Sequence, residues 1–128
     1  MQPHTHLAID QALCGRPVSL EPGRAVVRLE TLPAMAADDR GLVHGGFVFG
    51  LADYAAMLAV NDPLVVLGAA EVRFLAPVAV GETLVAEASV TAENGKQRQV
   101  DVAVRREEKT VLAGTLTCFV LERHVLDL

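Results

Sequence analysis

The sequence predicts an α+β domain in which an antiparallel sheet wraps around one central helix. Two observations support this fold class: a long apolar helical segment at residues 45–60, and six strand-like runs before and after it. The segment is apolar on nearly all sides, which is typical of a helix enclosed by a sheet rather than one lying at the surface. One long helix followed by consecutive strands joined by short turns is the order of an α+β domain.

The predicted elements are bounded by residues that favour turns or helix ends. Gly15 ends a first short helix, and Asn61-Asp62-Pro63 ends the central helix. Asn94-Gly95 is a hairpin signal between two runs that alternate apolar and polar residues. In chain order, the predictions are a helix at 4–14, strands at 16–20 and 24–31, the central helix at 45–60, and strands at 64–78, 82–93, 97–106 and 110–121.

Length and composition indicate a single domain, residues 1–128, that buries additional surface. Hydrophobic residues make up 52% and charged residues only 21%, a rich apolar content for a small monomer that favours contacts between subunits. The net charge of −5 provides no basic face for a nucleic acid. Since neither a secretory signal nor a membrane-length apolar run is found, we expect a cytoplasmic protein without membrane association.

The cysteines and the terminal histidines do not predict a metal or redox site. The spacing of Cys14 and Cys118 fits no metal or redox motif, and Cys118 lies in an apolar run that favours a place in the core. His4 and His6 have a spacing compatible with metal binding, but a mobile surface terminus is the favoured interpretation. We therefore expect no metal and no cofactor.

The strongest candidate for chemistry is Asp53, the only acid in the apolar segment between His44 and Val60. An ionised carboxylate in such surroundings is costly unless it serves a function. The start of the same helix offers free backbone N–H groups, and Gly45 and Gly46 lack side chains that would keep a ligand oxygen away. A substrate carbonyl at the Gly45 amide would have its developing oxyanion stabilised by about 3–4 kcal/mol.

The turn His44-Gly45-Gly46, followed by a small and apolar helix with an acid nine positions after the histidine, resembles the phenylacetyl-CoA-thioesterase-like group of hotdog-fold proteins. The resemblance covers roughly residues 24–121. It implies a hotdog fold and hydrolysis of a small or medium-chain acyl-CoA thioester to the free acid and coenzyme A. It also implies Asp53 as general base or nucleophile and the Gly45 amide as oxyanion donor. The candidate substrate-binding residues are His44, Gly46, Asp38 and Arg73.

Two of these candidates have specific expected roles. Arg73 is expected to meet a phosphate of coenzyme A. His44 either orients the substrate or anchors its loop through hydrogen bonds to the backbone, and the second interpretation is favoured.

The resemblance further implies a homodimer or a dimer of dimers. In the resembling group, the acid of one subunit faces the HGG turn of its neighbour, so that a monomer could not form the site. The predicted strand 64–78 is the expected contact edge, because it can pair with its symmetry mate to make one continuous sheet.

Two departures from the group's pattern leave a second function open. Asp38 stands six residues before the histidine, where active relatives often carry Asn or Gln, and a second carboxylate near Asp53 would raise the pKa of one of the pair. Leu67–Ala70 contains no hydroxyl, where active relatives often carry Ser or Thr.

The alternative function is that of a non-catalytic acyl-CoA-binding protein, a sensor or carrier, since Leu58 to Val90 also resembles the ligand-binding domains of malonyl-CoA-sensing regulators. A hydratase or dehydratase is less favoured, because no second histidine lies near the helix.

Overall fold

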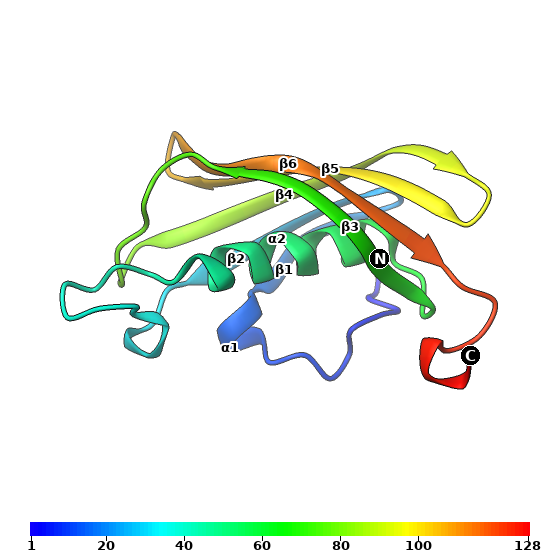
Figure 1. Cartoon of the computed structure of the whole chain (residues 1–128), viewed down its shortest axis with the longest axis horizontal. Coiled ribbons are helices and arrows are strands. Elements are labelled where there is room, and N and C mark those ends of the chain that lie inside the picture. Colours follow the sequence, from blue (N-terminus) through cyan, green and yellow to red (C-terminus); the bar gives the residue numbers. More distant parts are fainter.

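One curled antiparallel sheet arches over a single long helix in the computed structural model, which describes all 128 residues (Figure 1). The strands are β1 (Arg16–Glu21), β2 (Arg24–Glu30), β3 (Val65–Phe74), β4 (Thr83–Asn94), β5 (Gln97–Arg106) and β6 (Lys109–Val120). The helices are α1 (Gln11–Cys14) and α2 (Gly45–Val60), and 3-10 turns lie at Pro33–Met35 and Val125–Asp127. The strand order is β1-β2-β4-β5-β6-β3, with every neighbouring pair antiparallel. This architecture confirms the predicted fold class.

The bounds of α2 agree with the predicted segment 45–60. The C-terminal half of the helix is rich in alanine, leucine and methionine, which have high helix propensity. Asn61 ends the helix in the left-handed conformation, with φ of 54° and ψ of 45°, and its N–H donates to the carbonyl of Met57 at 2.8 Å. Asparagine tolerates this conformation better than most residues, so the predicted stop has a local physical cause.

The inner face of the sheet is formed by every second residue of its central strands, and this face covers α2. Along β5, Val100, Val102 and Val104 are buried, whereas Asp101 and Ala103 between them are exposed. The same period of two applies to β2 and β4, because side chains of a strand point alternately to its two faces. The buried residues of those two strands are Ala25, Val27, Leu29, Leu84, Ala86 and Ala88.

The N-terminal segment is held against the C-terminal end of α2. The side chain of Asn61 accepts a hydrogen bond from the His4 N–H at 2.7 Å and donates to the carbonyl of Gln2 at 3.0 Å. Thr5 is buried, and α1 lies against α2 on the side away from the sheet (Figure 1). His4 and His6 are exposed, as predicted, but the segment is held by hydrogen bonds and is not a free terminus. The sequence contains no local signal for these long-range bonds.

The first helix is shorter than the predicted 4–14. It covers only Gln11–Cys14, where the Asp10 side chain accepts a hydrogen bond from the first turn. His6 has a positive φ of 54°, which no continuous right-handed helix can contain. Gly15 ends α1 with φ of 108°, as expected from the sequence.

The strand predicted at 64–78 ends earlier, at Phe74. The Leu75 N–H still donates to the Val111 carbonyl of β6 at 2.7 Å, in register with the ladder, but the Ala76 N–H is directed to the same carbonyl at 3.4 Å, so the ladder does not continue. Pro77 then has no N–H to donate, so pairing cannot resume there. The other strands agree with their predicted bounds within one residue at each end.

We predict that Gly114→Ala lowers the free energy of unfolding by about 1–3 kcal/mol, the usual cost of forcing extra volume into a packed site. A Cβ at Gly114 would overlap the carbonyl oxygen of Glu71 and lie 2.6 Å from the Cα of Val72 on the neighbouring strand. Urea denaturation of Gly50→Ala provides the matched control. No atom lies within 4 Å of a Cβ at that helical position, so we expect a gain of about 0.5–1 kcal/mol. Equal stability of Gly114→Ala and the unaltered chain would contradict the strand contact.

Candidate active site

The N-terminus of α2 presents two backbone amides that have no hydrogen-bond partner. Gly45 and Gly46 begin the helix, and neither N–H donates to any group of the chain. The N-cap residue His44 provides no side-chain acceptor for them. Because free N–H groups at the start of a helix carry partial positive charge, this turn can hold a carbonyl oxygen or an oxyanion.

His44 holds the turn through its backbone. Its N–H donates to the carbonyl of Met35 at 2.9 Å, and its own carbonyl accepts from Phe47 at 3.0 Å. The imidazole is exposed, forms no hydrogen bond and lies edge-on to the Phe47 ring with centroids 6.2 Å apart. A Cβ on Gly46 would lie 3.1 Å from this imidazole, so the absence of a side chain at Gly46 lets the ring fold over the turn. The backbone of His44 thus anchors the turn, whereas its imidazole forms no hydrogen bond to the loop, and the two predicted roles of the side chain stay predictions.

Asp53 lies in the middle of α2 with an unsatisfied carboxylate. Its Oδ1 atom is fully buried and has no hydrogen-bond partner. Burial raises the pKa of the Asp53 carboxyl above its ordinary value, because the charged form loses hydration. A carboxylate that is poorly solvated and unpaired is well suited to take a proton from water or to attack a carbonyl carbon.

Two free thiols lie within electrostatic reach of Asp53. Burial raises the pKa of the Cys118 thiol to about 11, and the charge of Asp53 adds to this shift. The pKa of Cys14 is also raised, by burial first and then by the charges of Asp10 and Asp53. Cys14 ends α1 and Cys118 belongs to β6, so the charge of Asp53 acts on groups of both elements.

Asp38 is engaged by its own loop. Its Oδ1 atom accepts hydrogen bonds from the N–H groups of Arg40 at 2.9 Å and Leu42 at 3.2 Å, which is a side-chain-capped turn. The pKa of Asp53 is raised by burial and not by a second carboxylate. The coupling between the two acids that the sequence suggested is therefore absent within one chain.

Arg73 lies on the face of the sheet that is turned away from α2. Its neighbour Val72 packs against the core, and alternation along β3 directs Arg73 to the opposite face. The guanidinium is exposed and forms no hydrogen bond or ion pair. Within one chain the structure does not bring Arg73 to the Gly45 amide.

An apolar cavity of about 450 Å³ adjoins the helix N-terminus. The ring of Phe74 flanks Gly45, since a Cβ at Gly45 would lie 3.4 Å from it, and both Phe74 and the adjacent Leu75 are exposed. The lining residues are Val43, Gly45, Val48, Phe74, Leu75, Ala76, Pro77 and Val78. Sequence reasoning missed Phe74 and Leu75, because only the early end of β3 places them beside the helix.

β3 is one of the two edge strands of the sheet and pairs only with β6. Its residues Gly68–Glu71 are exposed. Leu67–Ala70 contributes no hydroxyl, and a side chain at Gly68 would require the Phe119 ring to move.

No group of three His, Cys, Asp or Glu side chains is arranged to hold a metal ion. No helix has the length and apolar character needed to cross a membrane.

The chain belongs to the thioesterase superfamily, whose family model matches residues 40–113. It is 38% identical over 113 residues to the acyl-coenzyme A thioesterase PaaI of Escherichia coli, covering 78% of this chain and 79% of that protein. The sheet curled over one helix is accordingly a hotdog fold. A solved structure of an uncharacterized protein, PH1136 from Pyrococcus horikoshii, superimposes with a TM-score of 0.98 and 55% identity, covering 99% of this chain and 98% of that one.

Other curated relatives are longer than this chain. A methylthioribose-1-phosphate isomerase of Aquifex aeolicus is 48% identical over 123 residues, covering 95% of this chain but 27% of that protein. The transcription factor FapR of Caldanaerobacter subterraneus is 29% identical over 113 residues, covering 88% of this chain and 56% of that protein. The chain thus spans about a quarter of the isomerase and about half of the regulator.

We predict that Asp53→Asn raises the melting temperature, and does so more at neutral than at acid pH. A carboxyl whose folded pKa is raised destabilises the folded state progressively as pH rises from its ordinary pKa to the raised one, whereas below the ordinary pKa both states are protonated and the penalty vanishes. Thermal unfolding of both proteins at about pH 3 and about pH 7.5 measures this difference. A stability difference that is the same at the two pH values would contradict the raised pKa.

Proposed function

We propose that the chain hydrolyses a small or medium-chain acyl-CoA thioester to the free acid and coenzyme A. The observation that carries this proposal is the Asp53 carboxylate, which has a raised pKa and one buried oxygen that no group of the chain satisfies. Such a group is costly to the fold, so a role in chemistry accounts for its presence in an apolar helix. The similarity to the acyl-coenzyme A thioesterase PaaI supports a thioester as substrate.

In the proposed reaction, Asp53 accepts a proton from water while the water oxygen attacks the thioester carbonyl carbon. The carbonyl oxygen becomes an oxyanion, which the free Gly45 N–H stabilises together with the positive end of the helix dipole. Collapse of this intermediate breaks the carbon–sulfur bond, and coenzyme A leaves as the thiol after taking up the proton. Direct attack by the Asp53 carboxylate, followed by hydrolysis of the resulting anhydride, is the other route open to the same residues.

The site requires a second copy of the chain. Gly45 and Asp53 are eight residues apart on one helix, which corresponds to about 12 Å along its axis, so one carbonyl carbon cannot be served by both. We propose a homodimer, or a dimer of dimers, in which Asp53 of one subunit faces Gly45 of the other. The unpaired edge of β3 supports this arrangement, because an exposed strand edge readily pairs with its symmetry mate.

A second candidate function is acyl-CoA binding without hydrolysis. It is favoured by the lack of a hydroxyl at Leu67–Ala70 and by the engagement of Asp38 in its own loop, which leave Asp53 without a polar partner in the chain. The similarity to the transcription factor FapR also supports a regulatory role for such binding. The two candidates differ in whether turnover depends on Asp53.

We predict that Asp53→Asn lowers turnover of acyl-CoA thioesters by about 10²–10⁴, the usual contribution of a positioned general base. Asparagine has nearly the same shape but cannot accept the proton or attack as a nucleophile. Release of free thiol from a panel of acyl-CoA thioesters measures turnover, and the thermal shift caused by coenzyme A measures binding, which should change little. Binding without Asp53-dependent hydrolysis in the unaltered chain would replace the enzyme by the non-catalytic candidate.

We also predict that Gly45→Pro lowers turnover by about 10²–10³ without unfolding the helix. Proline removes the N–H donor, is favoured at the first position of a helix, and suits the conformation of His44, with φ of −61° and ψ of 132°.

Mixing the two variants tests the shared site. If equal amounts of Asp53→Asn and Gly45→Pro chains assemble at random, half of the dimers are mixed and one site in each is intact, so about a quarter of the unaltered turnover returns. No recovery after verified exchange of subunits would exclude a site built from two chains.

A further inference from the structure

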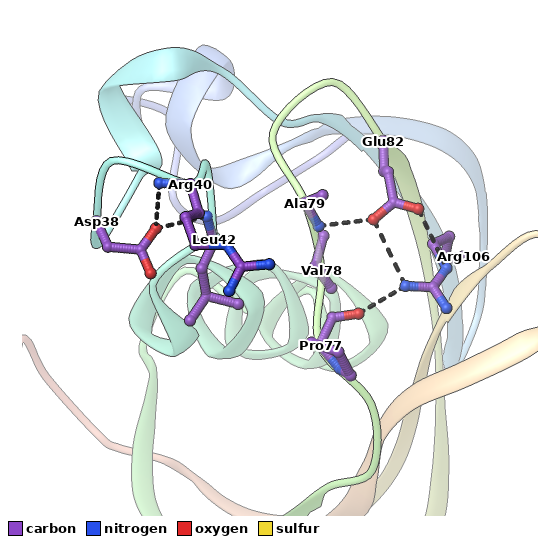
Figure 2. Close-up of a pocket in the computed structure, with 8 residues that line it drawn as sticks. All are labelled: Asp38, Arg40, Leu42, Pro77, Val78, Ala79, Glu82 and Arg106. Carbon is purple, nitrogen blue, oxygen red and sulfur yellow. Dashed lines mark hydrogen bonds and ion pairs between the residues drawn. The ribbon is translucent and has the colours of Figure 1, made fainter.

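A polar cavity of about 310 Å³ lies beside the loop that leads into α2 (Figure 2). One wall is the loop around Arg40, the other is the segment between β3 and β4, and Arg106 closes one side from the end of β5. The lining residues are Asp38, Arg40, Leu42, Pro77, Val78, Ala79, Glu82 and Arg106. None of the roles assigned above to Gly45 and Asp53 uses this cavity.

Most charges of the cavity are already paired. Glu82 forms an ion pair with Arg106 at 3.3 Å and accepts a hydrogen bond from the Ala79 N–H at 2.6 Å. Arg106 also donates to the carbonyl of Pro77 at 2.6 Å, so its guanidinium fixes the wall and offers little to a ligand. These contacts make Arg106 a positioning residue of the cavity.

Arg40 is the exception. Its guanidinium forms no hydrogen bond and no ion pair, although its backbone N–H is held by the Asp38 carboxylate. In Figure 2 the Arg40 side chain extends toward Pro77, whereas Asp38 lies on the other side of the loop. A planar guanidinium with all donors free is suited to bind the oxygens of a phosphate.

The polar cavity adjoins the apolar cavity beside Gly45. Pro77 and Val78 belong to the lining of both. The loop that leads into α2 and the segment between β3 and β4 are joined by two contacts. The Val43 N–H donates to the Val78 carbonyl at 2.8 Å, and Leu42 and Ala79 form an antiparallel β-bridge. Going outward from the helix N-terminus, a ligand would therefore meet the apolar cavity first and the cavity beside Arg40 second. A ligand with an apolar arm and an anionic end fits this order.

We propose that this cavity binds the phosphate-bearing end of the coenzyme A thioester, with Arg40 as its direct phosphate contact. The inference rests on the proposed function, and it assigns this contact to Arg40 in place of Arg73. Arg73 also has an unpaired guanidinium, but it lies on the outer face of the sheet, away from α2 and the apolar cavity.

Calorimetric titration of the unaltered protein and of Arg40→Gln with coenzyme A and with pantetheine, which lacks phosphate, tests the assignment. We expect Arg40→Gln to bind coenzyme A about tenfold more weakly and pantetheine unchanged, because only the charge-assisted phosphate contact is lost. Arg123→Gln is the matched control: it removes the same charge from an exposed position without ion pairs, and should bind both ligands like the unaltered chain. Added salt should weaken coenzyme A binding more in the unaltered chain than in Arg40→Gln.

The outcomes separate this inference from the proposed function. Asp53-dependent hydrolysis together with unchanged coenzyme A affinity in Arg40→Gln overturns the phosphate site alone. A loss of affinity in Arg73→Gln but not in Arg40→Gln overturns it as well. An affinity that depends on Arg40 in a chain without hydrolysis upholds the phosphate site and favours the non-catalytic candidate. No binding of coenzyme A to the unaltered chain overturns both.

Discussion

The whole arrangement depends on the burial of a helix that is apolar on nearly every side. Such a helix must be covered around its full circumference, and a curled sheet does so more completely than a flat one. The inner faces of β2, β4 and β5 cover one side, and α1 with the N-terminal segment covers part of the other. Asp53 lies where this covering leaves a carboxylate oxygen buried and unpaired. The candidate site is thus a consequence of how the helix is enclosed.

The fold could be predicted where its determinants are local. The bounds of α2 and the β4–β5 hairpin follow from signals within a few residues, such as the left-handed Asn61 and the turn Asn94-Gly95. The prediction was wrong where distant groups decide the conformation. The β3 ladder ends where the amides of Leu75 and Ala76 share the carbonyl of Val111, and this ending depends on a strand far along the chain.

The candidate site shows the same difference between residues with a local sequence signal and residues whose role depends on distant segments. Asp53 and Gly45 could be found from sequence because a lone acid in an apolar helix and a glycine at its start are visible in the residue order. Arg40 could not, since its significance depends on the segment around Pro77 lying opposite it across a cavity. Within one chain, the suggested coupling of Asp38 to Asp53 is absent for a local reason: an aspartate two residues before an available N–H caps its own turn.

The residue at position 61 must meet three independent structural requirements, which limit the residue types that can replace Asn61. The position needs a residue that accepts the left-handed conformation, a side-chain acceptor for the His4 N–H and a side-chain donor for the Gln2 carbonyl. Glycine would satisfy the backbone but neither side-chain bond, and aspartate would keep the acceptor but lose the donor. Glutamine carries both groups on a longer, more flexible arm and favours the left-handed conformation less. The end of the helix and the N-terminal segment are therefore held together by one side chain. Because its partners are the backbone groups of His4 and Gln2, the constraint on residue type falls on position 61.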